Sequence, residues 1–542
     1  MKKLLMLLLA IPVFQLTTAG TNRSTLQPRL IIGIVVDQMR YDYLYRFYDQ
    51  YSENGFKRLM REGMSFTYAQ YNYIPTYTGP GHASIYTGSV PYYHGIISND
   101  WYDKSAKKTI YCVKDSDVKT VGVDNNSGQM SPKNLLSATI SDQLRMSNNG
   151  HSRVFSISIK DRASIIPGGK MANAAYWYDG KSGNFISSTW YMKDLPAWVN
   201  RFNDQKLPSI LMNSGWNLEK AKNYQTSLPD EGPGEVDVFR EGKTTFPHQF
   251  NNLNDSAMRE LIKTTPFGNE LLTNFFNYLL ENEKTGQGEF CDFIAVSFSS
   301  TDYVGHAYGP NSVEIMDTYL KLDKQISKML DTLDKTLGKG NYLLFLTADH
   351  GVKPNSAYLD ANRIPSGRVI LKNMKLQIAE YCKSQFGSPF VIEAVQDNQV
   401  YLNHPLIDSL NLNIKDISNK VAGFMGVKFP SIRSILTKET LLSQTPARAM
   451  NSFIINGYNV VRSGDISFEL IQNYITSESR DEGTTHESSY NYDTHVPLIF
   501  FGWHIKPGES NQQVFIEDIA PTVTNLIHIQ EPETTIGVPL IR

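Results

Sequence analysis

The sequence contains little cysteine, no excess of charge of either sign and only one long apolar run. Its 542 residues include 3 cysteines, an odd number at wide spacing that excludes a disulfide framework and a cysteine-based zinc site. Lysine and arginine total 52 and aspartate and glutamate 54, a balance that argues against a general polyanion binder. With 11% aromatic residues the chain is no disordered tail, and we find no internal repeat. We expect a monomer with no nucleic-acid partner.

The apolar run lies at the N-terminus. Residues 1–19 combine Lys2 and Lys3 with a leucine-rich stretch and then a segment of small residues, which are the three regions of a secretory signal peptide. The run is too short to cross a membrane, and no later stretch approaches that length. We therefore predict a signal peptide at 1–19, a mature chain of residues 20–542, no membrane span and a periplasmic or secreted protein.

Continuous apolar runs predict strands that are buried on both faces, as in the centre of a parallel sheet. They occupy residues 30–36, 154–159, 290–297, 342–348 and 498–501. Periodic patterns predict helices over 47–61, from Ser131 through Leu144, from 311 to Gly338, and over 517–527. These elements favour an α/β fold with a central, mostly parallel sheet flanked by helices.

Two segments interrupt this pattern and are predicted to be cap or insertion segments. The first, at about 170–250, is rich in Tyr, Trp, Gly and Asn and predicts hairpins and loops that could roof a site. The second, at about 355–480, predicts a helix over 370–382, strands within 390–402 and a helix over 406–422. Both are expected to be parts of one catalytic domain that spans the mature chain.

Carboxylate and imidazole side chains stand at the ends of the predicted strands or just before one. They are Asp37, Asp302, His306, Asp349, His350 and His486. Ligands in open α/β sheets bind at the carboxyl ends of the strands, and this mixture of oxygen and nitrogen donors suits zinc. Any one of these residues could instead cap a helix or end a turn. Together they predict two zinc ions per chain, spaced to act on the attacking and the leaving oxygen of a phosphoryl transfer.

The segment 71–89 predicts a tight turn that leads into a helix. Hydroxyls on such a turn are exposed, with backbone N–H groups facing them, so Thr76 and Thr78 are both candidates for a nucleophile. The alternative is an ordinary Ser/Thr helix cap. His82 and His94 lie beside turns and are expected to be structural.

Two cations and one amide could bind an anion. Lys160 and Arg162 follow the strand that ends at 159, and on an extended segment they would share a face, which is costly unless an anion lies between them. The alternative is a solvated basic pair with Asp161 as its counter-ion. Asn99 could bind a substrate oxygen or simply form a turn.

On these motifs the chain resembles the alkaline phosphatase superfamily, and within it the PafA-type zinc phosphatases of exported bacterial enzymes. The motifs are Val36-Asp37, residues 75–82, residues 160–162, residues 302–306, residues 347–351 and Thr485-His486. The resemblance implies one zinc on Asp302, His306 and His486 and a second on Asp37, Asp349 and His350. It implies Thr78, not Thr76, as the nucleophile, held near zinc, and it implies that Asn99, Lys160 and Arg162 bind the phosphoryl oxygens.

One departure from the family pattern affects the ligand set. Glu487 follows His486 where relatives usually carry glycine, so His495 is kept as a reserve ligand. The cysteines lie far from the nucleophile turn, which argues against a sulfatase.

The resemblance implies an exported phosphate monoesterase that works through a phosphothreonine intermediate. It would release an alcohol and inorganic phosphate, which would also act as an inhibitor. The alternatives are a phosphodiesterase or nucleotide pyrophosphatase of the same superfamily, a relative of cofactor-independent phosphoglycerate mutase, and a non-catalytic binding protein. The signal peptide argues against the mutase, and the intact set of ligands argues against the binding protein.

Overall fold

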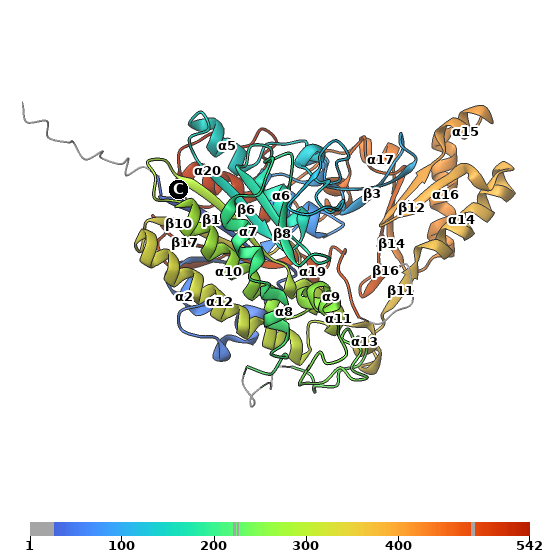
Figure 1. The fold of residues 1–542 in the computed structure, drawn as a ribbon. Helices are drawn as coiled ribbons and strands as arrows, with labels where there is room; N and C mark the ends of the chain where they lie inside the picture. Colours follow the sequence, from blue (N-terminus) through green and yellow to red (C-terminus); the bar gives the residue numbers. More distant parts are fainter. Residues whose placement is uncertain (1–26, 220–223, 225–226, 478–482, 542) are drawn as a thin grey trace, which may run out of the picture.

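The central element of the computed structural model is a ten-stranded sheet with helices on both faces (Figure 1). The structure describes residues 27–219, 224, 227–477 and 483–541, so the predicted signal peptide lies outside the described residues. The strand order is β18-β2-β17-β10-β1-β9-β6-β7-β8-β5, in which the outer strands are β18 (Gly508–Phe515), β2 (Met64–Gln70) and β5 (Thr120–Val121). No helix among the described residues is long and apolar enough to cross a membrane.

The middle of this sheet is parallel and fully buried. Its strands are β10 (Tyr342–Thr347), β1 (Leu30–Val36), β9 (Asp292–Phe298), β6 (Val154–Ser158) and β7 (Ala174–Asp179). On one side β17 (His495–Gly502) runs antiparallel to β10, and on the other β8 (Asn184–Ser188) runs antiparallel to β7. The predicted α/β fold with a mostly parallel sheet is confirmed.

Several predicted helices begin later than expected. The 47–61 pattern splits into a 3-10 turn, Tyr48–Gln50, and α2 (Phe56–Glu62). The predicted helix that starts at Ser131 is wrong: only a 3-10 turn, Pro132–Asn134, forms there, and α5 (Ile140–Ser147) starts after Thr139. Thr139 and Asp142 form a capping box, which fixes that start. Leu136, which lies between the two elements, is exposed.

The long helix α12 (Val313–Leu337) follows its prediction closely. Its N-cap is Ser312 and not residue 311. The Ser312 hydroxyl accepts a hydrogen bond from the backbone N–H of Ile315. The predicted C-terminal helix consists of a 3-10 turn, Ile516–Asp518, followed by α20 (Ile519–Leu526).

The first predicted insertion overlaps the main sheet. The hairpin expected there is present, but its strands β7 and β8 extend the sheet instead of standing outside it. The helices α7 (Ala197–Asp204) and α8 (Leu207–Met212) follow, and residues 228–250 then run without helix or strand.

The second predicted insertion contains a separate small sheet with its own core, which we call the cap. Its strand order is β12 (Ile392–Gln396), β13 (Gln399–Leu402), β15 (Ile466–Leu470) and β14 (Ile432–Thr437). The helices α14 (Leu371–Phe386) and α16 (Ile414–Lys428) pack on this sheet through a hydrophobic cluster distinct from the main core. The cap lies at the right of Figure 1. The helix predicted over 406–422 is two helices, α15 (His404–Ser409) and α16.

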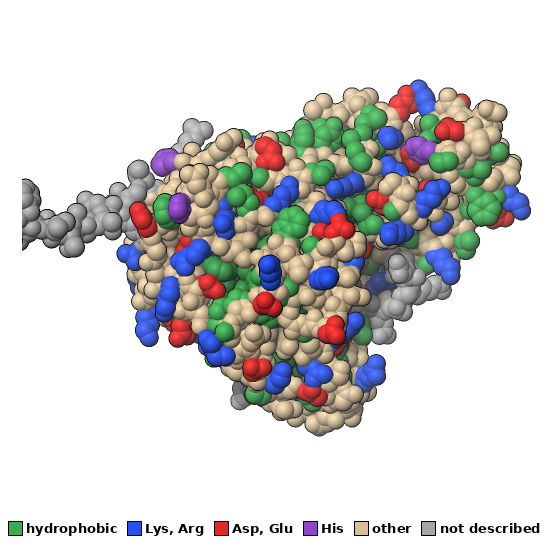
Figure 2. Space-filling model, turned by 45° about the horizontal axis from the view of Figure 1, so that its top comes forward, with side chains coloured by type: hydrophobic (Ala, Val, Ile, Leu, Met, Phe, Trp, Pro, Cys, Tyr) green, Lys and Arg blue, Asp and Glu red, His purple; other side chains and the backbone are tan. Residues whose placement is uncertain are grey.

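A hairpin of the main domain connects to the cap. It consists of β3 (Asp100–Asp103) and β4 (Lys108–Tyr111). The Thr109 hydroxyl donates to Gln396 Oε1 of the cap at 3.0 Å, and Ser98, just before the hairpin, donates to Asp397 Oδ2 at 2.6 Å. The surface carries both signs of charge interspersed on the face shown in Figure 2, which agrees with the balanced composition.

Candidate active site

The structure brings the predicted ligands together at one edge of the main sheet. Asp37 follows β1, Asp349 and His350 follow β10, and Asp302 lies on α11 (Ser300–Tyr308), which follows β9. His486 precedes β17, and because that strand runs antiparallel its start lies at the same edge as the other strands' ends. Strand direction therefore explains how residues far apart in the sequence converge.

Asp37, Asp349 and His350 form the first group. Their ligand atoms all lie within 4.8 Å of one another, and His350 Nε2 lies 3.5 Å from Asp37 Oδ1 and 3.6 Å from Asp349 Oδ2. All three side chains are fully buried. This group matches one of the two ligand sets that the family resemblance implies.

Asp302 is the centre of the second group. Its Oδ1 atom lies 3.1 Å from His306 Nε2 and 3.6 Å from His486 Nε2. Asp302 and His306 are four residues apart on α11, so they share one face of the helix. A second set of ligand atoms that all lie within 4.8 Å of one another comes from Asp302, His350 and His486. In this set the His350 and His486 rings stack, with 3.4 Å between their centroids. The two groups are therefore adjacent.

Each of the three histidines is oriented by a backbone carbonyl. The Nδ1 atoms of His306, His350 and His486 lie 2.7, 2.9 and 2.5 Å from the carbonyl oxygens of Thr484, Gly351 and Thr76. A carbonyl can only accept, so Nδ1 carries the proton and Nε2 presents its lone pair to the site, as in metal-ligating histidines.

The electrostatics of the site also fit a metal. Burial lowers the pKa of His486 to about 4, which keeps this imidazole neutral, and burial raises the pKa of Asp37 to about 6. Asp37 Oδ1, Asp349 Oδ2 and His350 Nε2 are buried with no hydrogen-bond partner among the described residues. Buried polar atoms without partners are costly, and divalent cations bound between them would satisfy them. The residues present therefore fit a pair of metal ions.

Thr78 is the first residue of α3 (Thr78–Thr87), and its hydroxyl faces this site. Lys160 Nζ lies 3.3 Å from Thr78 Oγ1, and Arg162 approaches the same atom at 3.5 Å. The Thr76 hydroxyl instead donates to the carbonyl of Ser488 at 3.2 Å. The geometry therefore favours Thr78 over Thr76 as the nucleophile.

The start of α3 is held in place by neighbouring residues. His82 Nδ1 lies 2.9 Å from the Thr78 carbonyl, and its Nε2 lies 2.9 Å from Ser297 Oγ. At Gly81 a β-carbon would lie 2.3 Å from the Asp349 carbonyl oxygen, so only glycine allows this close approach. His82 therefore has the structural role expected of it.

Lys160 and Arg162 approach the site differently from the prediction. They do not share an extended segment, because α6 (Asp161–Gly168) begins between them and Lys160 is its N-cap residue. Lys160 Nζ lies 2.8 Å from Asp37 Oδ2 and 2.5 Å from Asp302 Oδ2, and these carboxylates raise its pKa against the opposing effect of burial. A solvated basic pair, the alternative reading, is wrong for Lys160, which is buried.

Asn99 is placed beside the nucleophile by a backbone contact. The N–H of Gly79 donates to Asn99 Oδ1 at 2.8 Å, which leaves the Asn99 amide NH₂ as a donor. The hydrogen bond ties Asn99 to the first turn of α3.

Two further residues of the site were not predicted from the sequence. Gln38 donates from Nε2 to Asp302 Oδ1 at 2.8 Å and from its backbone N–H to Asp349 Oδ1 at 3.1 Å, so it connects the two groups. The Arg162 guanidinium donates to the Tyr111 hydroxyl at 3.0 Å, which holds the cation in position. The only sequence signal for Gln38 is that it directly follows Asp37. No sequence pattern near Tyr111 indicates its contact with Arg162.

The remaining histidines lie outside the site. His495, the reserve ligand, packs at 4.3 Å against the Tyr41 ring, and its Nε2 lies 2.8 Å from the Thr67 carbonyl. His94 contacts Ser84 Oγ at 3.1 Å. Glu487 turns away from the metal groups and accepts a hydrogen bond from the Tyr77 hydroxyl at 2.9 Å.

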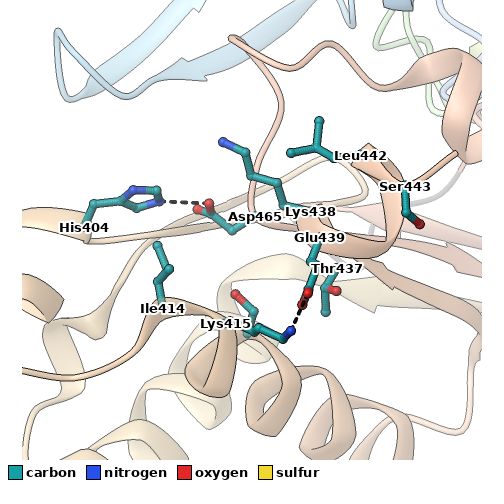
Figure 3. Close-up of a pocket in the computed structure, with 10 residues that line it drawn as sticks. His404, Ile414, Lys415, Thr437, Lys438, Glu439, Leu442, Ser443 and Asp465 are labelled. Atoms are coloured by element: carbon teal, nitrogen blue, oxygen red, sulfur yellow. Dashed lines mark hydrogen bonds and ion pairs between the residues drawn. The ribbon is translucent and has the colours of Figure 1, made fainter. Parts of the chain in front are cut away.

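A separate cavity of about 550 Å³ lies within the cap (Figure 3). His404 and the buried Asp465 form a 2.8 Å ion pair at one end, and Lys438 and Leu442 line it further along. None of the predicted site residues lines this cavity.

The comparisons with known proteins agree with this geometry. The type I phosphodiesterase / nucleotide pyrophosphatase family matches residues 31–433. Alkaline phosphatase PafA of Elizabethkingia meningoseptica is 42% identical over 96% of this chain and 95% of its own length. Alkaline phosphatase PhoV of Synechococcus elongatus is 44% identical over 95% of this chain and 92% of its own.

The similarity extends to three dimensions. A crystal structure of wild-type PafA superposes with a TM-score of 0.90 at 42% identity, covering 95% of this chain and 98% of that one. The match spans the main sheet and the segments predicted as insertions. The chain thus belongs to the type I phosphodiesterase / nucleotide pyrophosphatase family of the alkaline phosphatase superfamily, alongside PafA and PhoV.

Proposed function

We propose that this chain is an exported two-zinc phosphate monoesterase that acts through a phosphothreonine intermediate. It is an enzyme, a phosphoric monoester hydrolase of the alkaline phosphatase kind. The observation that carries the proposal is the position of Thr78 Oγ1, which faces both Lys160 and Arg162 beside two groups of metal-type ligands.

The metal sites are assigned to the residues that converge there. Asp37, Asp349 and His350 would hold one zinc, and Asp302, His306 and His486 the other, with Thr78 beside them. When bound, zinc supplies positive charge that favours the ionised form of an attacking hydroxyl and stabilises negative charge on a leaving oxygen. Imidazole ligands favour zinc over magnesium.

The chain's own residues carry the chemistry in two steps. Thr78 Oγ1 loses its proton to solvent and forms a bond to phosphorus, while the bond from phosphorus to the leaving oxygen breaks and that oxygen takes a proton from solvent to become the alcohol. Water then attacks the phosphothreonine and releases inorganic phosphate and the free hydroxyl. Lys160, Arg162 and the Asn99 amide would donate to the non-bridging oxygens, where charge is greatest in the transition state. Phosphate itself fits the same donors and should inhibit.

The cations select for monoesters. A phosphate monoester carries two negative charges near neutral pH, and all its non-bridging oxygens are free to accept from Lys160 and Arg162. A diester carries one charge and has a second organic group in place of one oxygen. A bulky second group would also collide with the buried Lys160.

The test is a comparison of kcat/KM for an aryl phosphate monoester and its methyl diester on the purified protein. The proposal expects strong preference for the monoester, with weak diesterase activity. The second candidate is a phosphodiesterase, which the family description itself names. Equal or greater kcat/KM for the diester would favour that reading. Purification of the mature chain from the periplasm, with a mass that lacks residues 1–19, would test export.

A further inference from the structure

A cavity between the main domain and the cap borders the candidate site. It has a volume of about 750 Å³, within the range of pockets that hold small molecules. Tyr77, Asp100 and Thr476 line it from one side. Tyr77 directly precedes Thr78, and Asp100 directly follows Asn99, so the cavity adjoins the site at two points.

Glu487 provides a third connection. It directly follows His486, is buried, and accepts hydrogen bonds from the Tyr77 hydroxyl at 2.9 Å and from the Thr476 hydroxyl at 2.5 Å. The Tyr77 ring also lies 5.4 Å from the His486 ring, nearly perpendicular to it. Glu487 thus fixes two residues of the cavity wall against a ligand of the Asp302 group.

The opposite wall comes from the cap. Gln396 lies at the end of β12, and Lys372 lies in the first turn of α14. Gln396 Oε1 accepts from the Thr109 hydroxyl at 3.0 Å, which leaves the Gln396 amide NH₂ as a donor. Lys372 is exposed and can also donate to a molecule in the cavity.

The two walls offer complementary hydrogen-bonding groups. On the side of Glu487 the Tyr77 and Thr476 hydroxyls donate to that carboxylate, so their oxygens remain as acceptors. On the cap side Gln396 and Lys372 remain as donors. A hydroxyl group both donates and accepts, so a molecule with several hydroxyls can bind both walls at once.

We infer that this cavity binds the leaving alcohol of the substrate and selects hydroxyl-rich alcohols, such as the sugar of a sugar phosphate, with Gln396 and Lys372 as specificity-determining residues. The inference rests on the proposed phosphomonoesterase function. The cavity begins beside Tyr77 and His486. It can hold the leaving group because that group extends away from the phosphoryl donors Lys160 and Arg162.

The test compares two alkyl monoesters, a hexose 6-phosphate and methyl phosphate, whose leaving groups are both primary alcohols. The quantity measured is the ratio of kcat/KM for the hexose ester to that for methyl phosphate. In a Gln396→Ala, Lys372→Ala double variant we expect this ratio to fall by about tenfold, the effect of one or two lost hydrogen bonds. Lys438→Ala, in the separate cap cavity of Figure 3, is the matched control and should keep the wild-type ratio.

Each outcome has a distinct meaning. A double variant that keeps the wild-type ratio, while its melting temperature and zinc content match those of the wild type, overturns the inference, whether or not kcat/KM falls equally for both esters. The melting temperature and zinc content of the variant show whether an equal loss comes from misfolding. If the double variant misfolds, the test is repeated with Gln396→Glu, which keeps the size of the side chain but removes the amide donor. If the wild type hydrolyses neither ester, the proposed function fails and the inference with it.

Discussion

Lys160 Nζ lies 3.3 Å from Thr78 Oγ1 in a site where the lysine also contacts Asp37 and Asp302. The ammonium thus links the nucleophile to both groups of metal-type ligands. Because Arg162 reaches the same hydroxyl from α6, the two cations and the hydroxyl act as one unit. This arrangement leads to separate tests of the nucleophile, the cations and the metals.

Replacing Thr78 by alanine should lower turnover by at least about 10³-fold, because the hydroxyl is the group that bonds to phosphorus. Metal content should stay near that of the wild type. Thr76→Ala is the matched control, since its hydroxyl donates to Ser488 and not to the site. If Thr76→Ala is the inactive variant and Thr78→Ala turns over normally, the assignment of the nucleophile is wrong.

The cations should matter more for monoesters than for diesters. Replacing both Lys160 and Arg162 by alanine should cost an aryl monoester about 2–4 kcal/mol in transition-state binding, the scale of a lost oxyanion donor, and its methyl diester far less. The measurement is kcat/KM for both substrates with the wild type and the double variant. Equal losses on both substrates would mean that the pair has a structural role.

Removing metal should abolish activity. Chelation should inactivate the protein, and zinc should restore activity better than magnesium because three of the ligands are imidazoles. Elemental analysis should find about two zinc ions per active chain. His306→Ala should lose metal, whereas His495→Ala, whose imidazole contacts the Thr67 carbonyl, should keep it. Fewer than about two zinc ions in fully active protein would contradict the two-metal reading.

The central sheet was predictable because its strands are buried on both faces. The apolar runs at 30–36 and 342–348 correspond almost residue for residue to β1 and β10, and the carboxylates that end them lie together as expected. Strand pairing brings such positions to one edge whatever the sequence distance between them. The sequence alone therefore predicts that these carboxylates lie together at one edge of the sheet.

Other features depend on contacts that no local pattern marks. The helix expected from Ser131 does not form because the capping box at Thr139 starts the helix later. Gln38 is not a metal-type residue, and its role depends on Asp302 and Asp349, which are distant in sequence. The division of the histidines between the two groups likewise depends on the stacking of His350 on His486, which is a tertiary contact.

The buried carboxyl group of Glu235 makes the stability of the fold depend on pH. It is 7% exposed, and neither carboxylate oxygen has a hydrogen-bond partner among the described residues. Burial raises its pKa from 4.5 to about 7. Between these two values the folded protein holds a proton that the unfolded chain has lost, so the contribution of Glu235 to the free energy of unfolding falls as pH rises.

Glu235→Gln removes this titration while it keeps the size of the side chain. The melting temperature of the variant should therefore exceed that of the wild type at pH 8, and the difference should be smaller at pH 5, where the wild-type carboxyl is protonated in the folded state. Glu231→Gln, four residues away and exposed, is the control and should show no such trend. Taking the difference between variant and wild type at each pH cancels the titration of the metal ligands, which both proteins share. A difference of the same size at both pH values would show that Glu235 is not the group that titrates.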